Sequence, residues 1–268
     1  MIEVEDWTEV RDRTGSSPVI LHAPHGGIAV PAAVRGQFRL GETELAEEIR
    51  IMTDHGVDRL ARIAATSTQA SVMIDLLSRL VVDVERFPGP EEEKNAVGMG
   101  VLYTHGSQRQ VIREVATGER AGLMAFFDAH SARMTQLVEQ ALARHGTAVI
   151  IDVHSYHTYP EPHELYTEEP RPPLCIGYEA PHMTPALRDM VAAAFAGFEQ
   201  GDNQTFHGSY VPLPHYGRDA RVQSVMLEIR RDQYMDERSG QMREAEVARL
   251  GAALSDLVRK VEDHFCVS

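Results

Sequence analysis

The sequence has few cysteines, no surplus of positive charge and no long hydrophobic run. Its two cysteines, Cys175 and Cys266, are far apart and form no CxxC pair, so we expect incidental thiols in a reducing compartment. The formal net charge of -14 argues against nucleic acid or an anionic membrane as the main partner, because both favour a basic face. No apolar run approaches the roughly 18 residues of a membrane span.

The amino terminus, MIEVEDWTEV, is acidic and has no apolar segment of the kind found in a secretory signal. We therefore expect a cytoplasmic protein. Its partner is expected to be a small anionic molecule, with no nucleic acid and no membrane involved, because an acidic protein can still hold a local basic pocket.

Several catalytic signatures are also missing. The sequence contains no GxxxxGK[ST], no GxGxxG after a strand, no GxSxG and no HExxH. These absences remove the sequence support for a P-loop, a dinucleotide fold, an α/β-hydrolase and a metalloprotease with both histidines on one helix.

The composition is that of an ordinary globular protein, with 43% hydrophobic and 25% charged residues, and we expect a single domain over residues 1–268. Apolar runs predict strands at 18–23, 80–84, 148–153, 174–177 and 222–229. Helical spacing predicts helices at 41–65 (with a break near residues 53 and 54), 120–145, 185–198 and 236–264. Alternating strands and helices favour an α/β fold with helices on both sheet faces.

Two of the thirteen histidines follow or end predicted strands. His25 lies in the turn "APHGG", whose glycines allow a close backbone approach. His154 ends the strand "AVIIDVHS", and Asp152 lies two residues earlier on the same face, where it can orient the imidazole. The alternatives are a turn histidine and a solvent-facing strand end. In open α/β sheets the site lies beyond the carboxyl ends of the strands, which favours the functional interpretation.

Three carboxylates are candidates for metal binding or proton transfer. Asp54 and Asp58 lie one helical turn apart, and either can complete a zinc site with two histidines, although Asp54 can equally be a helix N-cap. Glu228 has apolar neighbours, so burial is expected to raise its pKa and make it a general base near a metal. The alternative for Glu228 is a structural salt bridge to Arg230 or Arg231.

Two arginines and one loop are candidates for substrate contacts. Arg79 and Arg86 bracket the apolar run "LVVDV", which indicates an anion pocket unless they pair with neighbouring carboxylates such as Asp83. The loop 203–217 is dense in glycine, proline, histidine and tyrosine, and it can close over substrate with His207 and Tyr210 as contacts.

Seven segments follow one another along residues 20 to 240: "HAPHGGIAVP", "TDHGVDRLA", "SRLVVDVERFP", "GVLYTHG", "IDVHS", "HGSYVPLPHYG" and "VMLEIRRDQYMDE". This ordered set resembles the N-formylglutamate amidohydrolase family, and more distantly the zinc carboxypeptidase and aspartoacylase type of fold. Each segment is short, and the ordered set is much more specific than any one of them.

The resemblance implies a three-layer α/β/α sandwich around a mixed, mostly parallel sheet, with one bound Zn²⁺. By position, His25 and His154 would be metal ligands, and the carboxylate ligand would be Asp54, with Asp58 the competing choice. Glu228 would be the general base. Arg79 and Arg86 would bind substrate carboxylates.

This chain departs from the family pattern at one residue and in two loops. Glu85 replaces an amide before Arg86, and the loops 88–98 and 156–173 do not match. These loops can set the acyl or amino-acid preference.

The resulting hypothesis is a zinc amidohydrolase that acts on N-formyl-L-glutamate. One alternative is a zinc peptidase or deacylase of the same fold acting on another substrate, such as a cell-wall peptide. A second alternative is a non-catalytic protein that binds a small anion.

Overall fold

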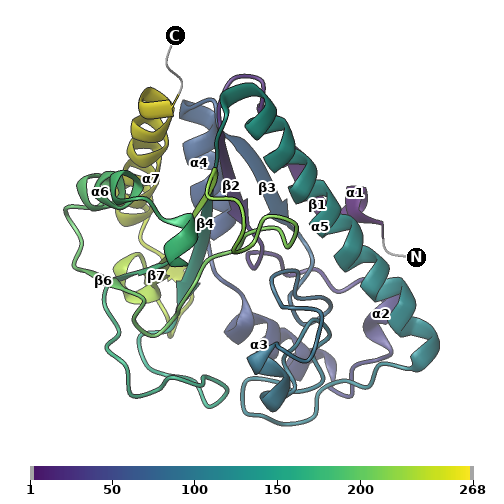
Figure 1. The fold of residues 1–268 in the computed structure, drawn as a ribbon. Helices are drawn as coiled ribbons and strands as arrows, with labels where there is room; N and C mark the ends of the chain where they lie inside the picture. Colours follow the sequence, from purple (N-terminus) through teal and green to yellow (C-terminus); the bar gives the residue numbers. More distant parts are fainter. Residues whose placement is uncertain (1–2, 266–268) are drawn as a thin grey trace.

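A seven-stranded sheet forms the centre of the protein in the computed structural model, which describes residues 3–265 (Figure 1). The strand order is β1-β3-β2-β4-β7-β5-β6. Four neighbouring pairs are parallel, and β1·β3 and β5·β7 are antiparallel, so the predicted mixed, mostly parallel sheet is confirmed. The strands are β1 Thr8–Arg11, β2 Val19–Ala23, β3 Ser71–Asp75, β4 Ala148–Tyr156, β5 Leu174–Gly177, β6 Gln200–Asp202 and β7 Val222–Arg230.

Helices cover both faces of this sheet, as Figure 1 shows. One face packs against α4 (Val57–Ser67), α6 (Pro185–Ala194) and α7 (Glu244–Phe265), and the opposite face against α5 (Thr117–His145). The other helical elements are α1 Val4–Trp7, α2 Ala32–Arg35, α3 Glu42–Met52, η1 Glu93–Val97, η2 Ala180–His182 and η3 Arg231–Gln233. Within residues 3–265, no helix combines the length and the apolar character needed to cross a membrane.

Side-chain alternation along β4 decides which face of the sheet carries the polar groups. Val149, Ile151 and Val153 pack into the core under α4, α6 and α7, whereas Ile150 packs under α5. Because successive side chains point to opposite faces, Asp152 and His154 lie on the α5 face. The same reasoning places His22 of β2 and Glu228 of β7 on that face, since Ile20 belongs to the α5 core and Leu227 to the other.

The predicted strand at 80–84 is wrong. This apolar run is buried but forms turns and irregular structure, and the strand of this region is the earlier segment β3. The buried side chain of Arg113 donates hydrogen bonds to the carbonyl oxygens of Leu80 and Val81, at 2.9 and 2.6 Å. Since a cation satisfies these carbonyl groups, the run is buried without a neighbouring strand.

The break predicted near residues 53 and 54 is confirmed, because α3 ends at Met52 and α4 begins at Val57. Gly56, with φ of 79°, occupies the N-cap position of α4, so Asp54 does not cap that helix. The C-terminal helix begins at Glu244 rather than at residue 236, because Met235–Asp236 (β8) and Gln241–Met242 (β9) form a hairpin there. The helix predicted to end at residue 198 ends at Ala194. Cys175 is buried and free, and Cys266 lies outside the described residues.

Asp75, the last residue of β3, makes the stability of the fold dependent on pH. Burial raises the pKa of its carboxyl to about 8, although a 2.9 Å hydrogen bond from Thr8 opposes the shift. Because this folded-state pKa lies above the unfolded value near 4, stability is lost as the pH rises towards 8.

We expect Asp75→Asn, which mimics the protonated acid, to be more stable than the wild type at pH 8. The free energy of unfolding of the variant relative to the wild type should increase by on the order of 3 kcal/mol between pH 5 and pH 8. Urea unfolding at both pH values measures it, with the exposed Asp256→Asn as control. An equal difference in stability at both pH values would contradict the protonated state of Asp75.

Candidate metal centre and active-site pocket

Three segments bring His25, Asp54 and His154 together at the carboxyl end of the sheet. His25 follows β2 by two residues, and His154 lies near the end of the adjacent strand β4. Asp54 lies in the short connection between α3 and α4, and its backbone N–H donates to the carbonyl oxygen of His25 at 2.9 Å. All three side chains are buried.

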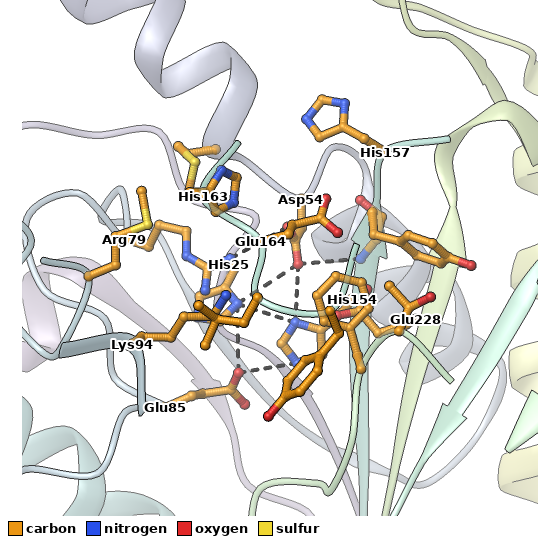
Figure 2. A pocket seen from close by; sticks show the side chains of 18 of the residues that line it. His25, Asp54, Arg79, Glu85, Lys94, His154, His157, His163, Glu164 and Glu228 are labelled. Carbon is orange, nitrogen blue, oxygen red and sulfur yellow. Dashed lines mark hydrogen bonds and ion pairs between the residues drawn. The ribbon is translucent and has the colours of Figure 1, made fainter. Parts of the chain in front are cut away.

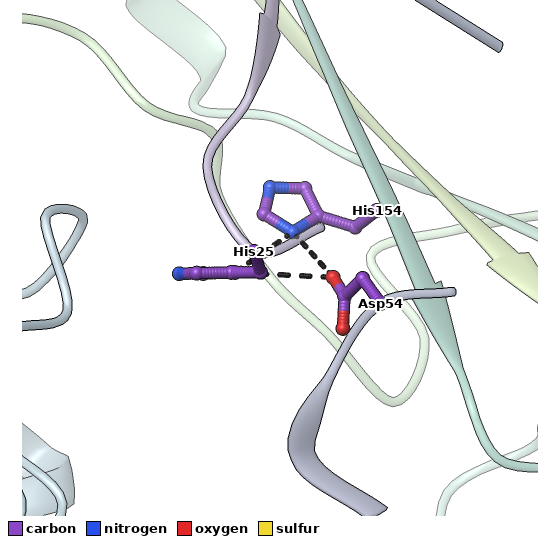
Figure 3. Close-up of side chains that lie close together, drawn as sticks. All are labelled: His25, Asp54 and His154. Atoms are coloured by element: carbon purple, nitrogen blue, oxygen red, sulfur yellow. Dashed lines mark hydrogen bonds and ion pairs between the residues drawn. The ribbon is translucent and has the colours of Figure 1, made fainter. Parts of the chain in front are cut away.

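The three side chains present their donor atoms to one another, as Figure 3 shows. The Nδ1 atoms of His25 and His154 are 3.2 Å apart, and Asp54 Oδ2 lies 3.1 Å from His154 Nδ1 and 3.8 Å from His25 Nδ1. Ligands about 2.1 Å from a tetrahedral zinc ion lie about 3.4 Å from one another. The two histidines and the carboxylate therefore fit the first coordination sphere of a zinc ion with a fourth position open.

The surroundings favour the protonation state of a metal ligand at His25 and Asp54, but not at His154. Burial and the nearby charge of Arg79 lower the pKa of His25, which favours the neutral imidazole. Burial opposes the charged form of His154, but the carboxylates of Glu85 and Asp152 outweigh it and hold its pKa well above the ordinary value, so a metal must displace a proton there. Burial opposes ionisation of Asp54, but the hydrogen bond to His154 and the nearby charge of Arg79 outweigh it, and its pKa falls to about 2. Asp54 is therefore an anion over the whole physiological range, as a carboxylate ligand must be.

Asp83 holds the ligand His25 and both predicted substrate arginines. Its Oδ1 lies 3.0 Å from His25 Nε2, and its Oδ2 accepts from Arg79 at 2.8 Å and lies 3.3 Å from Arg86 Nε. The Tyr103 hydroxyl donates to the same oxygen at 2.8 Å. The alternative in which Arg79 and Arg86 pair with Asp83 is thus correct. Asp83 also orients His25, as outer carboxylates do for metal-bound histidines.

A pocket of about 300 Å³ opens onto the three-residue cluster. Figure 2 shows Glu228 beside His154, its register partner in the adjacent strand. Burial raises the pKa of Glu228 to about 8, and its Oε2 has no hydrogen-bond partner among the described residues. The predicted salt-bridge alternative is not found, since Arg230 pairs with Asp232 and Arg231 lies 3.7 Å from Asp54. Glu228 is therefore free to exchange a proton with a molecule in the pocket.

The pocket is also lined by cations, one of which the sequence reasoning missed. Arg79, Arg86 and Lys94 all line it, and Figure 2 shows Arg79 and Lys94 on the side away from Glu228. Lys94 is half-buried and has no carboxylate within ion-pair distance in residues 3–265. Burial and the two arginines lower its pKa to about 8. An anionic group of a ligand would give the Lys94 ammonium group the ionic partner that it lacks. Lys94 lies in the unmatched loop 88–98, and only its position in an otherwise acidic stretch could have marked it.

The remaining predicted residues lie farther from the cluster. Asp58 is half-buried on the side of α4 and pairs with Arg62, so it does not compete with Asp54. His207 is exposed at the rim of the pocket and lies 2.9 Å from Glu169. Tyr210 lines a neighbouring pocket instead, and the centroid of its ring is 5.0 Å from that of His22.

Asp152 contacts His154 as the strand geometry predicts. Its Oδ1 lies 3.2 Å from His154 Nε2, and Glu85 Oε2 lies at the same distance from that nitrogen. Two carboxylates thus hold the side of the ring that faces away from Asp54, which fixes Nδ1 in the direction of the cluster.

The chain matches a known protein family and resembles solved structures. A family model described as N-formylglutamate amidohydrolase matches residues 17–235. A search of curated proteins gives no match. A crystal structure of an N-formylglutamate amidohydrolase from Ralstonia eutropha JMP134 superimposes with a TM-score of 0.79 at 21% identity, covering 97% of this chain and 98% of that chain. A structure of a gene product from Agrobacterium tumefaciens gives 0.69 at 18% identity, covering 97% and 96%. These two structures share the fold.

Proposed function

Because the chain belongs to the N-formylglutamate amidohydrolase family, we propose that it is a zinc-dependent hydrolase that cleaves the amide bond of an N-acyl amino acid. The substrate that we propose is N-formyl-L-glutamate, with formate and L-glutamate as products. The observation that carries the proposal is the convergence of His25 Nδ1, His154 Nδ1 and Asp54 Oδ2 in a pocket that also holds Glu228.

His25, Asp54 and His154 would hold the zinc ion, which when bound supplies a Lewis acid and acidifies water at neutral pH. Glu228 takes the proton from the attacking water and then donates it to the leaving nitrogen. Its unpartnered Oε2 and its position beside His154 suit both transfers. Its pKa, which burial raises to about 8, makes the protonated form a competent acid.

The arginines position the substrate for this reaction. Arg79 and Arg86 are held by Asp83, so they present fixed donors to a carboxylate of the amino acid. An arginine also balances the negative charge that develops on the acyl oxygen. Fixed partners of this kind reduce the entropy lost when the substrate binds.

Lys94 is proposed to bind a second carboxylate, because it is the pocket cation that has no ionic partner in the described residues. We expect Lys94→Met to raise KM for a dicarboxylic substrate by about 10-fold, the effect of losing one charged hydrogen bond of 1.5 kcal/mol or slightly less.

N-formyl-L-norleucine, which lacks the side-chain carboxylate, should show almost no change with Lys94→Met, and this substrate is the internal control. Steady-state kinetics of both compounds measures the difference. An equal increase in KM for the two substrates would show that Lys94 does not bind the second carboxylate.

A panel of substrates tests the proposed function. Purified, zinc-loaded protein is assayed with N-formyl-L-glutamate, its N-acetyl and N-succinyl analogues, and short γ- and α-linked glutamyl peptides. The proposal predicts the highest kcat/KM for N-formyl-L-glutamate. Preferential cleavage of another acyl group or of a peptide would show the deacylase or peptidase alternative, and ligand binding without turnover of any member would show the non-catalytic alternative.

A further inference from the structure

We propose that the protein has a second divalent-cation site directly beside the first, formed by His22 Nδ1, Glu85 Oε1 and Asp152 Oδ1. The nitrogen and the two carboxylate oxygens all lie within 4.8 Å of one another. Asp152 Oδ1 is 3.0 Å from His22 Nδ1, and Glu85 Oε1 is 3.4 Å from it. These separations are those of neighbouring ligands on one metal ion.

The three donor atoms point at one another without making hydrogen bonds. His22 and Asp152 are almost wholly buried, and the side chain of Glu85 is 11% exposed. Each of the three atoms is buried without a hydrogen-bond partner in the described part of the chain. Buried polar atoms are nearly always satisfied, so three that converge on one point indicate that a bound group completes them.

The charge of the cluster favours a cation. Glu85 and Asp152 are carboxylates in a low-dielectric interior, and within residues 3–265 their charged contacts are histidines, with no lysine or arginine at ion-pair distance. Two buried carboxylates need a positive counter-charge, which either protons on the neighbouring histidines or a divalent cation can provide. A divalent ion compensates both of them, and one imidazole with two carboxylates is a donor set that suits zinc or manganese.

Glu85 links this second cluster to the first. Its Oε1 faces His22, whereas its Oε2 lies 3.2 Å from His154 Nε2 and 3.6 Å from His25 Nδ1. Figure 2 shows the Glu85 side chain directed at both histidines. A cation bound at Oε1 would fix the carboxylate whose other oxygen lies beside His154 Nε2, so the second site would hold a proposed ligand of the first in place.

The second cluster adjoins a pocket of its own. Glu85 and Asp152 line a pocket of about 370 Å³, and Glu85 also lines the pocket of the first cluster. Tyr210 and Met226 line the 370 Å³ pocket as well, whereas His25, Asp54 and His154 do not.

Metal stoichiometry tests this proposal, and it does so independently of the substrate. The full chain is stripped with a chelator, titrated with zinc chloride and separately with manganese chloride, freed of excess metal and analysed by mass spectrometry. We expect two metal ions per wild-type chain, one in Asp54→Asn, one in Glu85→Gln and none in the double variant. The matched control Glu93→Gln, which changes a pocket glutamate outside both clusters, should retain two.

A wild-type chain that saturates at one ion which Glu85→Gln retains, or a Glu85→Gln variant that still binds two, would overturn the proposal. In the first case a proton on His22 would take the place of the cation. If Glu85→Gln does not fold, anomalous diffraction from zinc-soaked wild-type crystals decides, with a second peak among His22, Glu85 and Asp152 expected and its absence contradicting the site. A single ion that Glu85→Gln removes and Asp54→Asn leaves would uphold the second site and refute the proposed catalytic one.

Discussion

We expect the His154→Ala variant to lose one equivalent of zinc and at least about 10³-fold in kcat/KM for N-formyl-L-glutamate. The size of this loss follows from the several kcal/mol of charge stabilisation that a Lewis acid provides, at 1.36 kcal/mol for each factor of ten. His154 supplies one of the three converging donor atoms, and its loss leaves only His25 and Asp54. Two ligands hold zinc much more weakly than three.

The control is His215→Ala, which makes the same change at a half-buried histidine that contacts Asp219 and belongs to neither cluster. It should retain both the metal and the activity. Because His154 is buried in a central strand, circular dichroism and thermal unfolding must accompany the assay. A folded His154→Ala protein with wild-type zinc content or turnover would contradict the assignment of His154 as a ligand.

The second large effect is expected from Glu228→Gln. This change keeps the size of the side chain but removes its ability to accept and return a proton. General acid–base groups contribute about 10² to 10⁴ in rate, and we expect kcat to fall within that range. KM and metal content should stay near those of the wild type, because Glu228 is not one of the converging donors.

The pH dependence gives a further readout for Glu228. A general base acts in its ionised form, so activity in the wild type should rise with pH as Glu228 loses its proton, and Glu228→Gln should lack this limb. The control is Glu164→Gln, another buried glutamate of the pocket, whose partner is Arg171. A Glu228→Gln variant within twofold of wild-type kcat would show that another group transfers the proton.

The sequence was sufficient to predict four strands of the sheet (β2, β4, β5 and β7), the longer helices and the groups found together in the pocket, but not β1, β3 and β6. Apolar runs ending in polar residues correctly indicated β2, β4 and β7, and the family resemblance selected His25, Asp54 and His154 from many candidates. Local pattern alone could not decide between Asp54 and Asp58, because both suit a helix start. Tertiary contacts distinguish the two residues, because Asp54 lies beside His154, whereas Asp58 pairs with Arg62 of its own helix.

The errors have physical causes that lie outside the local pattern. The run at 80–84 has strand composition, and it is irregular because the distant Arg113 satisfies its carbonyl groups. Nothing in the local pattern marks His22 as functional, yet strand alternation places it on the same face as Asp152 and His154 once the register of β2 and β4 is known. Lys94 belongs to a loop with no periodic pattern, so only the fold shows that it lines the pocket.

The central claim is that a metal held by His25, Asp54 and His154 is required for amide hydrolysis. Its most direct test is the activity of one protein preparation on N-formyl-L-glutamate before chelation, after chelation, and after zinc is restored. We predict that turnover stops when the metal is removed and returns with stoichiometric zinc. Full turnover by protein shown to be free of metal would contradict the account.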